Sequence, residues 1–170
     1  GPGDVQWMTA GGGIIHEEFH SPGFAKSGGT LEMAQLWVNL PAAHKMTPAG
    51  YQPITAAQIP TVSLPEGAGR VRVIAGAWGE AKGPARTFTP IHMLDVALAA
   101  GRTAELPQPE GWTTLVVVAS GSASVNGAEP VTGPAVVTLS TAGEGVTVQA
   151  GSDAKLLLLS GEPIDEPVVG

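Results

Sequence analysis

The sequence contains no cysteine, few aromatic residues and few positive charges. The absence of cysteine excludes disulfides, zinc thiolate sites and cysteine nucleophiles, and it fits a reducing compartment, so we expect a cytoplasmic protein. Only 8 Lys and Arg residues are scattered along 170 positions, and the net charge is -7. We therefore expect no direct nucleic-acid binding, because phosphate contacts require clustered basic side chains.

Long hydrophobic runs are also absent from the sequence. A membrane helix needs about 20 apolar residues in a row. The longest apolar run that stands out, LLLL at 156–159, has only the length of a strand. We expect neither a membrane span nor a signal peptide.

What the sequence does contain is short β-branched runs separated by 24 glycines and 15 prolines. This pattern is typical of an all-β sandwich or barrel. The expected strands cover residues 5–10, 13–20, 31–40, 58–64, 70–78, 91–100, 113–120, 122–127, 135–140, 145–150 and 154–161. Residues 40–53 are predicted to form a polar loop with one helical turn.

Local patterns refine this prediction at three places. Val71 and Val73 alternate with Arg70 and Arg72, as a half-buried strand requires. Gly121, between two apolar runs, predicts a tight hairpin with a left-handed backbone. The Asn126-Gly127 pair (126–127) predicts a turn.

Gly, Pro and charged residues interrupt the strand rhythm at 77–90. We place a boundary there and predict two β units, residues 1–80 and 81–170.

Four collinear segments resemble the pirin family of the cupin superfamily. They are PGDVQWMTAGGGIIHEEF (2–19), LWVNLP (36–41), TPIHMLDVAL (89–98) and LLLLSGEPIDEPVVG (156–170). The resemblance implies a bicupin, in which residues 1–80 form the C-terminal part of a first barrel and residues 81–170 form a second. The family's His-x-His ligand strands would precede Gly1 and its C-terminal segment would follow Gly170. We therefore expect an internal piece of a pirin, with an incomplete first barrel.

In this family a metal, usually iron, is held by three His and one Glu. The resemblance assigns two of these ligands to His16 and Glu18, and it implies Fe(II) or another divalent metal, which a fragment would not necessarily retain. Some bacterial members oxidise the flavonol quercetin with dioxygen, and a mammalian member is an iron-dependent transcriptional co-regulator.

The residues of GIIHEEFH (13–20) allow two interpretations. In a strand His16 and Glu18 would share one face, with their Cα atoms roughly 7 Å apart. Imidazole plus carboxylate is the ligand mixture of non-haem iron oxygenases, and Glu18 could act as a ligand or as the catalytic base for a flavonol hydroxyl. Alternatively, the pair is only the polar face of a surface strand.

Other candidates are weaker. His20 would lie beyond the barrel centre, so we expect it on the surface. His44 and His92 are expected to be hydrogen-bonded or exposed histidines rather than ligands. Trp7 and Met8 could either line the mouth of the metal pocket or belong to the core.

Three functional hypotheses follow from these features. The first is a quercetin 2,3-dioxygenase-type enzyme acting on a flavonol, with substrate-binding residues that the sequence does not identify. The second is a non-catalytic metal-sensing protein that regulates a partner, and the third is an inactive fragment. We also expect self-association, because removing strands from a barrel exposes unpaired edges.

Overall fold

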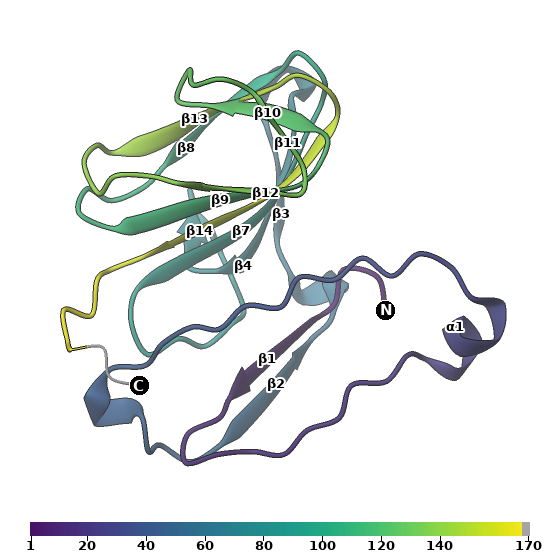
Figure 1. Ribbon diagram of the computed structural model, residues 1–170, viewed down its shortest axis with the longest axis vertical. Helices are drawn as coiled ribbons and strands as arrows, with labels where there is room; N and C mark the ends of the chain where they lie inside the picture. Colours follow the sequence, from purple (N-terminus) through teal and green to yellow (C-terminus); the bar gives the residue numbers. More distant parts are fainter. Residues whose placement is uncertain (168–170) are drawn as a thin grey trace.

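Six antiparallel strands form the larger sheet of the computed structural model, which describes residues 1–167 (Figure 1). Their order in space is β12-β9-β14-β7-β4-β3. They span Ala135–Thr138 (β12), Thr113–Ser120 (β9), Ala154–Gly161 (β14), Ile91–Leu98 (β7), Gly69–Ala75 (β4) and Thr61–Ser63 (β3). The pirin-like segment 156–170 ends with residues 168–170, which lie outside the described residues.

A second sheet of four strands faces the first, in the order β11-β10-β13-β8. Its strands span Val131–Thr132 (β11), Ser122–Val125 (β10), Gly145–Ala150 (β13) and Thr103–Pro107 (β8). The inner faces of the two sheets enclose one apolar core, to which Leu94, Val116 and Leu158 of the large sheet and Val148 of the small sheet contribute fully buried side chains. We call residues 61–161 the C-terminal barrel. The all-β prediction is confirmed.

Strand β4 shows why alternation is a good guide in this barrel. Val71 and Val73 are both 0 % exposed, while Arg70 is exposed. Arg72 faces the other side of the sheet, where its Nη1 donates to Asp95 Oδ2 on β7 at 2.6 Å. The predicted alternation is therefore confirmed.

The predicted hairpin at Gly121 is wrong. Strand β9 pairs with β12 and β14, whereas β10 pairs with β11 and β13 in the other sheet. The chain turns a corner between sheets at Gly121, whose φ is +78°, and a Cβ there would lie 2.1 Å from the carbonyl oxygen of Asp153. Glycine is needed both for the backbone angle and for this close approach. The turn predicted at Asn126-Gly127 (126–127) is confirmed.

Strands β1 (Val5–Thr9) and β2 (Gly50–Ile54) form a separate antiparallel pair. Ile54, at 2 % exposure, and Trp7 pack with Met93 and Ile74 of the large sheet in a second, smaller core. Met93 lies next to the inward-facing Leu94 on β7, so this second core covers the outer face of the large sheet.

The 40 residues between β1 and β2, which we call the N-terminal arm (10–49), leave the body of the molecule as a long excursion (Figure 1). Two short helical elements lie in the arm: α1 (Pro22–Ser27) and a 3₁₀ turn (Ala42–His44). The 3₁₀ turn confirms the helical turn expected within 40–53, although β2 was not predicted there. None of the helices in residues 1–167 is long and apolar enough to cross a membrane.

The strands predicted at 13–20 and 31–40 are wrong. Within residues 1–167 neither segment pairs with another strand, and almost every residue of both segments is exposed. Apolar alternation is not sufficient for a strand, because its backbone N–H and C=O groups also require a partner.

Four short elements complete the described chain: β5 (Ala77–Trp78), β6 (Ala81–Lys82) and two 3₁₀ turns (Ala56–Gln58 and Pro65–Gly67). Strands β3 and β4 belong to the same sheet as β7, so hydrogen bonding continues across residue 80. The division into units at that residue stays a prediction.

Candidate metal and substrate site

The segment GIIHEEFH (13–20) follows directly after β1, from which a glycine run separates it. Gly11 has a φ of +54°, and a Cβ at this position would lie 1.9 Å from the carbonyl oxygen of Thr47. Only glycine allows the start of the arm to pass this close to its return before β2. The N–H of Gly13 then donates to the carbonyl of Ala10 at 2.9 Å and closes the turn. The glycines thereby bring His16 back alongside β1 and β2.

His16 lies in the wall of an open pocket of about 400 Å³. The pocket is lined by Gln6, Met8, Ile14, Ile15, His16, Glu17, Ala49, Gly50 and Tyr51. Met8 of β1 and Tyr51 of β2 are direct partners in the strand register, so their side chains lie on the same face of the pair. The strand side of the wall carries Met8 and Tyr51 with the polar Gln6, and the arm side carries His16 and Glu17 with Ile14 and Ile15.

The two predicted ligands do not share this pocket. His16 and Glu18 are both exposed, but Glu17 rather than Glu18 joins His16 in the pocket wall. Because the segment is not part of a sheet, its neighbours do not hold the two side chains on one face.

The sequence allowed Trp7 and Met8 either to line the pocket or to belong to the core, and the structure places one residue in each role. Met8 lines the pocket. Trp7 packs in the smaller core, and its indole Nε1 donates to the carbonyl of Arg86 at 2.8 Å. Tyr51 was not assigned to the pocket, because it falls in the segment predicted to be a polar loop. Its pairing with Met8 could be recognised only once β2 was known.

The other histidines have aromatic or hydrogen-bonding neighbours. The His20 ring lies 5.4 Å from the Phe24 ring, and the His44 ring lies 5.1 Å from Phe88, measured between centroids. His92 is hydrogen-bonded to Gln108, with 2.9 Å between Nδ1 and Oε1. His92 is thus a hydrogen-bonded histidine of the barrel.

The candidate ligands have the donor atoms that a metal site needs, but there are too few of them. Imidazole nitrogen and carboxylate oxygen are the donors of non-haem iron sites. Protein sites, however, generally hold a metal through three or more ligands. Among residues 1–167 no group of three His, Cys, Asp or Glu side chains lies close enough to hold an ion. His16 and Glu18 alone therefore do not make a metal centre.

One carboxylate near the start of β1 links two segments of the chain. The N–H of Ala56 donates to Oδ1 of Asp4 at 2.8 Å. Asp4 thereby ties the start of β1 to the 3₁₀ turn that follows β2.

Comparison with known proteins places both ends of the chain in one family. Residues 93–170 match the model of the pirin C-terminal cupin domain, and residues 1–38 match the pirin model. A Pseudomonas aeruginosa protein with the provisional name quercetin 2,3-dioxygenase is 51 % identical over 170 residues, covering 100 % of this chain and 59 % of its own length. A Thermoplasma acidophilum protein with the same provisional name is 30 % identical over 183 residues, covering 98 % of this chain and 69 % of its own length.

The crystal structure of a quercetin 2,3-dioxygenase from Acinetobacter baumannii superposes with a TM-score of 0.95 at 50 % identity. The superposition covers 99 % of this chain and 58 % of the Acinetobacter chain. The fold is thus of the cupin type, and the chain spans about three-fifths of the length of both the Pseudomonas and the Acinetobacter proteins.

Proposed function

The chain belongs to the pirin family. From this premise we propose that His16 and Glu18 contribute two ligands to a divalent-metal site, preferably for Fe(II), that serves oxidation of a flavonol of the quercetin type. The names of the Pseudomonas, Thermoplasma and Acinetobacter proteins support the reaction class. A complete site would need further ligands beyond these two.

The observation that carries this proposal is the position of His16 in the pocket beside Met8 and Tyr51. The pocket volume of about 400 Å³ lies within the range of about 300–1,000 Å³ found for small-molecule sites. A flat three-ring flavonol suits apolar and aromatic walls such as Met8, Ile14 and Tyr51, since these contacts bury its ring faces. Its oxygens would lie toward His16 and Glu17.

Each side chain then has a defined task. A bound divalent metal would supply Lewis acidity and an electron path between the flavonol and dioxygen. Met8 and Tyr51 hold the rings of the substrate and exclude water from one of its faces. Glu18 would serve either as the second ligand or as the base that accepts the proton of the flavonol hydroxyl.

The test is metal content and quercetin-dependent oxygen uptake, measured on the same samples. We expect His16→Ala and Glu18→Ala each to lower metal affinity by at least about tenfold and to abolish oxygen uptake, because each removes a ligand. His20→Ala is the matched control, because His20 is exposed on the same segment and lies against Phe24 rather than in the pocket. Loss of metal that is equal in His20→Ala and His16→Ala would contradict the assigned ligands.

A second function, metal-dependent regulation of a protein partner, is favoured by the surface of the arm. Ile15, Phe19 and Trp37 are 101 %, 84 % and 94 % exposed. Apolar surface of this kind marks sites of interaction. Metal binding that depends on His16 but is accompanied by no oxygen uptake would favour this regulatory function. Absence of any metal binding would favour an inactive fragment.

A further inference from the structure

The interior of the C-terminal barrel changes from apolar to polar at one end. His92, Ser160 and Thr114 lie directly opposite one another on β7, β14 and β9. Thr114 and Ser160 are 4 % and 5 % exposed, and their hydroxyl oxygens are 2.8 Å apart. Two residues further along the same strands, the same inward face carries Leu94, Leu158 and Val116. The polar row therefore ends the hydrophobic core.

Gln108, on the segment between β8 and β9, covers this row. Its side chain is 5 % exposed, and its Oε1 accepts a hydrogen bond from Nδ1 of His92. The Trp112 ring lies 5.0 Å from the His92 ring between centroids. Gly76 leaves room for the imidazole, since a Cβ there would lie 2.3 Å from Cδ2 of His92. The histidine is thus held on three sides.

One half of the Gln108 amide has no partner. Nε2 is buried and makes no hydrogen bond within residues 1–167. If the amide were turned over, Nε2 would face His92 and the oxygen would be left instead, so one polar atom is unpaired in either orientation. Such buried atoms are rare in folded proteins.

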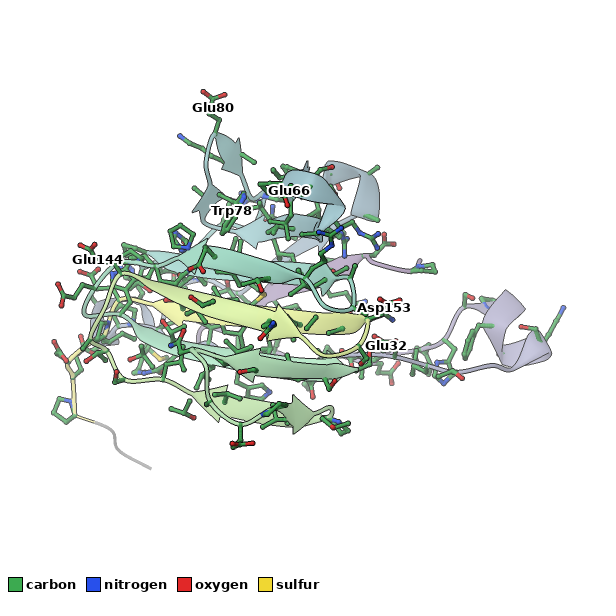
Figure 2. The ribbon with its side chains drawn as sticks, turned by 90° about the horizontal axis from the view of Figure 1, so that it is seen from above. Glu32, Glu66, Trp78, Glu80, Glu144 and Asp153 are labelled. Atoms are coloured by element: carbon green, nitrogen blue, oxygen red, sulfur yellow. The ribbon has the colours of Figure 1, made fainter. Side chains whose placement is uncertain are left out.

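A pocket of about 170 Å³ adjoins these groups. Gln108, Trp112, Thr114, Asn126, Ser140 and Val146 are among its lining residues, and within the described part of the chain no charged side chain lines it. It lies at the end of the barrel marked by Glu144, opposite the end marked by Asp153 (Figure 2). The backbone N–H of Gln108 donates to the carbonyl of Glu144 at 3.0 Å and anchors the rim.

We propose that this pocket is a second binding site, which takes a small uncharged molecule with a single hydroxylated aromatic ring. A cavity of about 150 Å³ is known to hold one benzene ring, so a pocket of about 170 Å³ suits one ring and is too small for a three-ring flavonol. An ionised ligand would lack a countercharge in the wall. Trp112 offers a flat aromatic surface, and ligand oxygens meet the hydroxyls of Thr114 and Ser140.

The unpaired Gln108 amide gains a partner in this arrangement. Nε2 is covered in the absence of ligand, so a ligand oxygen would pair with it only after the amide turns toward the pocket. The site is separate from the His16 pocket and does not depend on the function proposed for it.

Resorcinol is a suitable probe, followed by two-dimensional ¹H–¹⁵N NMR on the whole chain. We expect saturable shifts of the Trp112 indole signal and of the amides of residues 138–146, with a dissociation constant of about 1 mM for a ligand of this size. Thr114→Val should weaken binding about fivefold, because it removes one hydrogen bond. Thr113→Val is the matched control, because Thr113 precedes Thr114 on β9 and is exposed on the outer face. It should leave binding unchanged.

Shifts that rise linearly with resorcinol through about 10 mM would overturn the proposal, since they indicate no defined site. Equal weakening by both valine variants would overturn it as well. If Thr114→Val does not fold, benzene and quercetin provide the same test on the unaltered chain. Benzene should bind at least about fivefold more weakly than resorcinol, for lack of hydroxyls, and quercetin should leave the Trp112 signal in place. Equal binding by all three would overturn the proposal.

Discussion

The N-terminal arm and the C-terminal barrel are both rich in apolar residues, but the barrel buries them and the arm exposes them. In the barrel, Leu94 and Leu158 are fully buried between two sheets. In the arm, Phe19 and Trp37 are 84 % and 94 % exposed. The difference lies in the backbone, because β7 and β14, which carry these leucines, have paired strands on both sides, whereas the arm segments pair with no strand among residues 1–167. Apolar side chains become a core only where the backbone is also paired.

The same contrast separates the two pockets. The His16 pocket is large and open, and exposed arm residues supply part of its wall. The Gln108 pocket is smaller, and it is lined by Thr114, Thr138, Gly145 and Val146 of barrel strands together with the loops that join these strands. Backbone hydrogen bonds from Gln108 to Glu144 and from Gly111 to Thr141 tie these loops together, whereas the arm side of the His16 pocket requires additional contacts to hold its geometry.

Truncating a large apolar side chain in each region should give the largest difference. We expect Leu158→Ala to lower the free energy of unfolding by about 2–5 kcal/mol, because it leaves a cavity in the core. Trp37→Ala should change it by less than about 0.5 kcal/mol, because the indole is already in water. Urea unfolding measures both values. An equally large loss in Trp37→Ala would show that the arm packs against something in solution.

Glycine substitutions should sharpen the comparison within the barrel. Gly121→Ala combines a left-handed φ with a Cβ only 2.1 Å from the Asp153 carbonyl oxygen. We expect a loss of about 2–4 kcal/mol from strain and overpacking. Gly127→Ala is the control, since its φ is +72° but nothing lies within 4 Å of the added Cβ. It should cost only about 1 kcal/mol. Equal thermal destabilisation of both variants would mean that the chain does not turn this corner as described.

Charge pairs should show the smallest difference. Arg72 joins β4 to Asp95 on β7 and also donates to the carbonyl of Gly3, with its side chain 16 % exposed. Lys155 of β14 joins Glu32 of the arm at 2.7 Å, with both side chains more than half exposed. Glu32 lies beside the Asp153 end of the barrel (Figure 2).

Removing each of these two cations compares the stability contribution of a partly buried ion pair with that of an exposed one. Arg72→Ala should lower stability by about 1.5–3 kcal/mol, because charged hydrogen bonds are lost from partly buried groups. Lys155→Ala should lower it by about 0–1 kcal/mol and become neutral in high salt. Chemical denaturation at two salt concentrations measures both effects. A larger loss for Lys155→Ala would mean that the arm is held more firmly than its exposure indicates.

Self-association through exposed barrel edges stays a prediction. Size-exclusion chromatography with light scattering tests it, and a stable monomer at every concentration would contradict it.

Sequence patterns predicted the barrel better than the arm. Strands β4, β7, β9, β13 and β14 were predicted because valine and leucine mark their inward faces. Strand β8 (Thr103–Pro107) was missed because its TAELP sequence carries weak strand propensity, although Ala104 and Leu106 alternate inward. Residues 13–20 and 31–40 were predicted as strands on the same grounds that succeeded elsewhere, but they pair with no other strand in the part of the chain that the structure describes.

The sequence by itself determined the all-β class, the inward faces of the barrel strands and the family, since these depend on side-chain pattern and on motifs within short segments. Only the tertiary structure decided that Gly121 joins two sheets, that Tyr51 meets Met8, and that Gln108, Trp112 and Thr114 gather at one end of the barrel. These arrangements join residues that are not neighbours in one element. They depend on which strands exchange hydrogen bonds, and local pattern does not specify the partner of a strand.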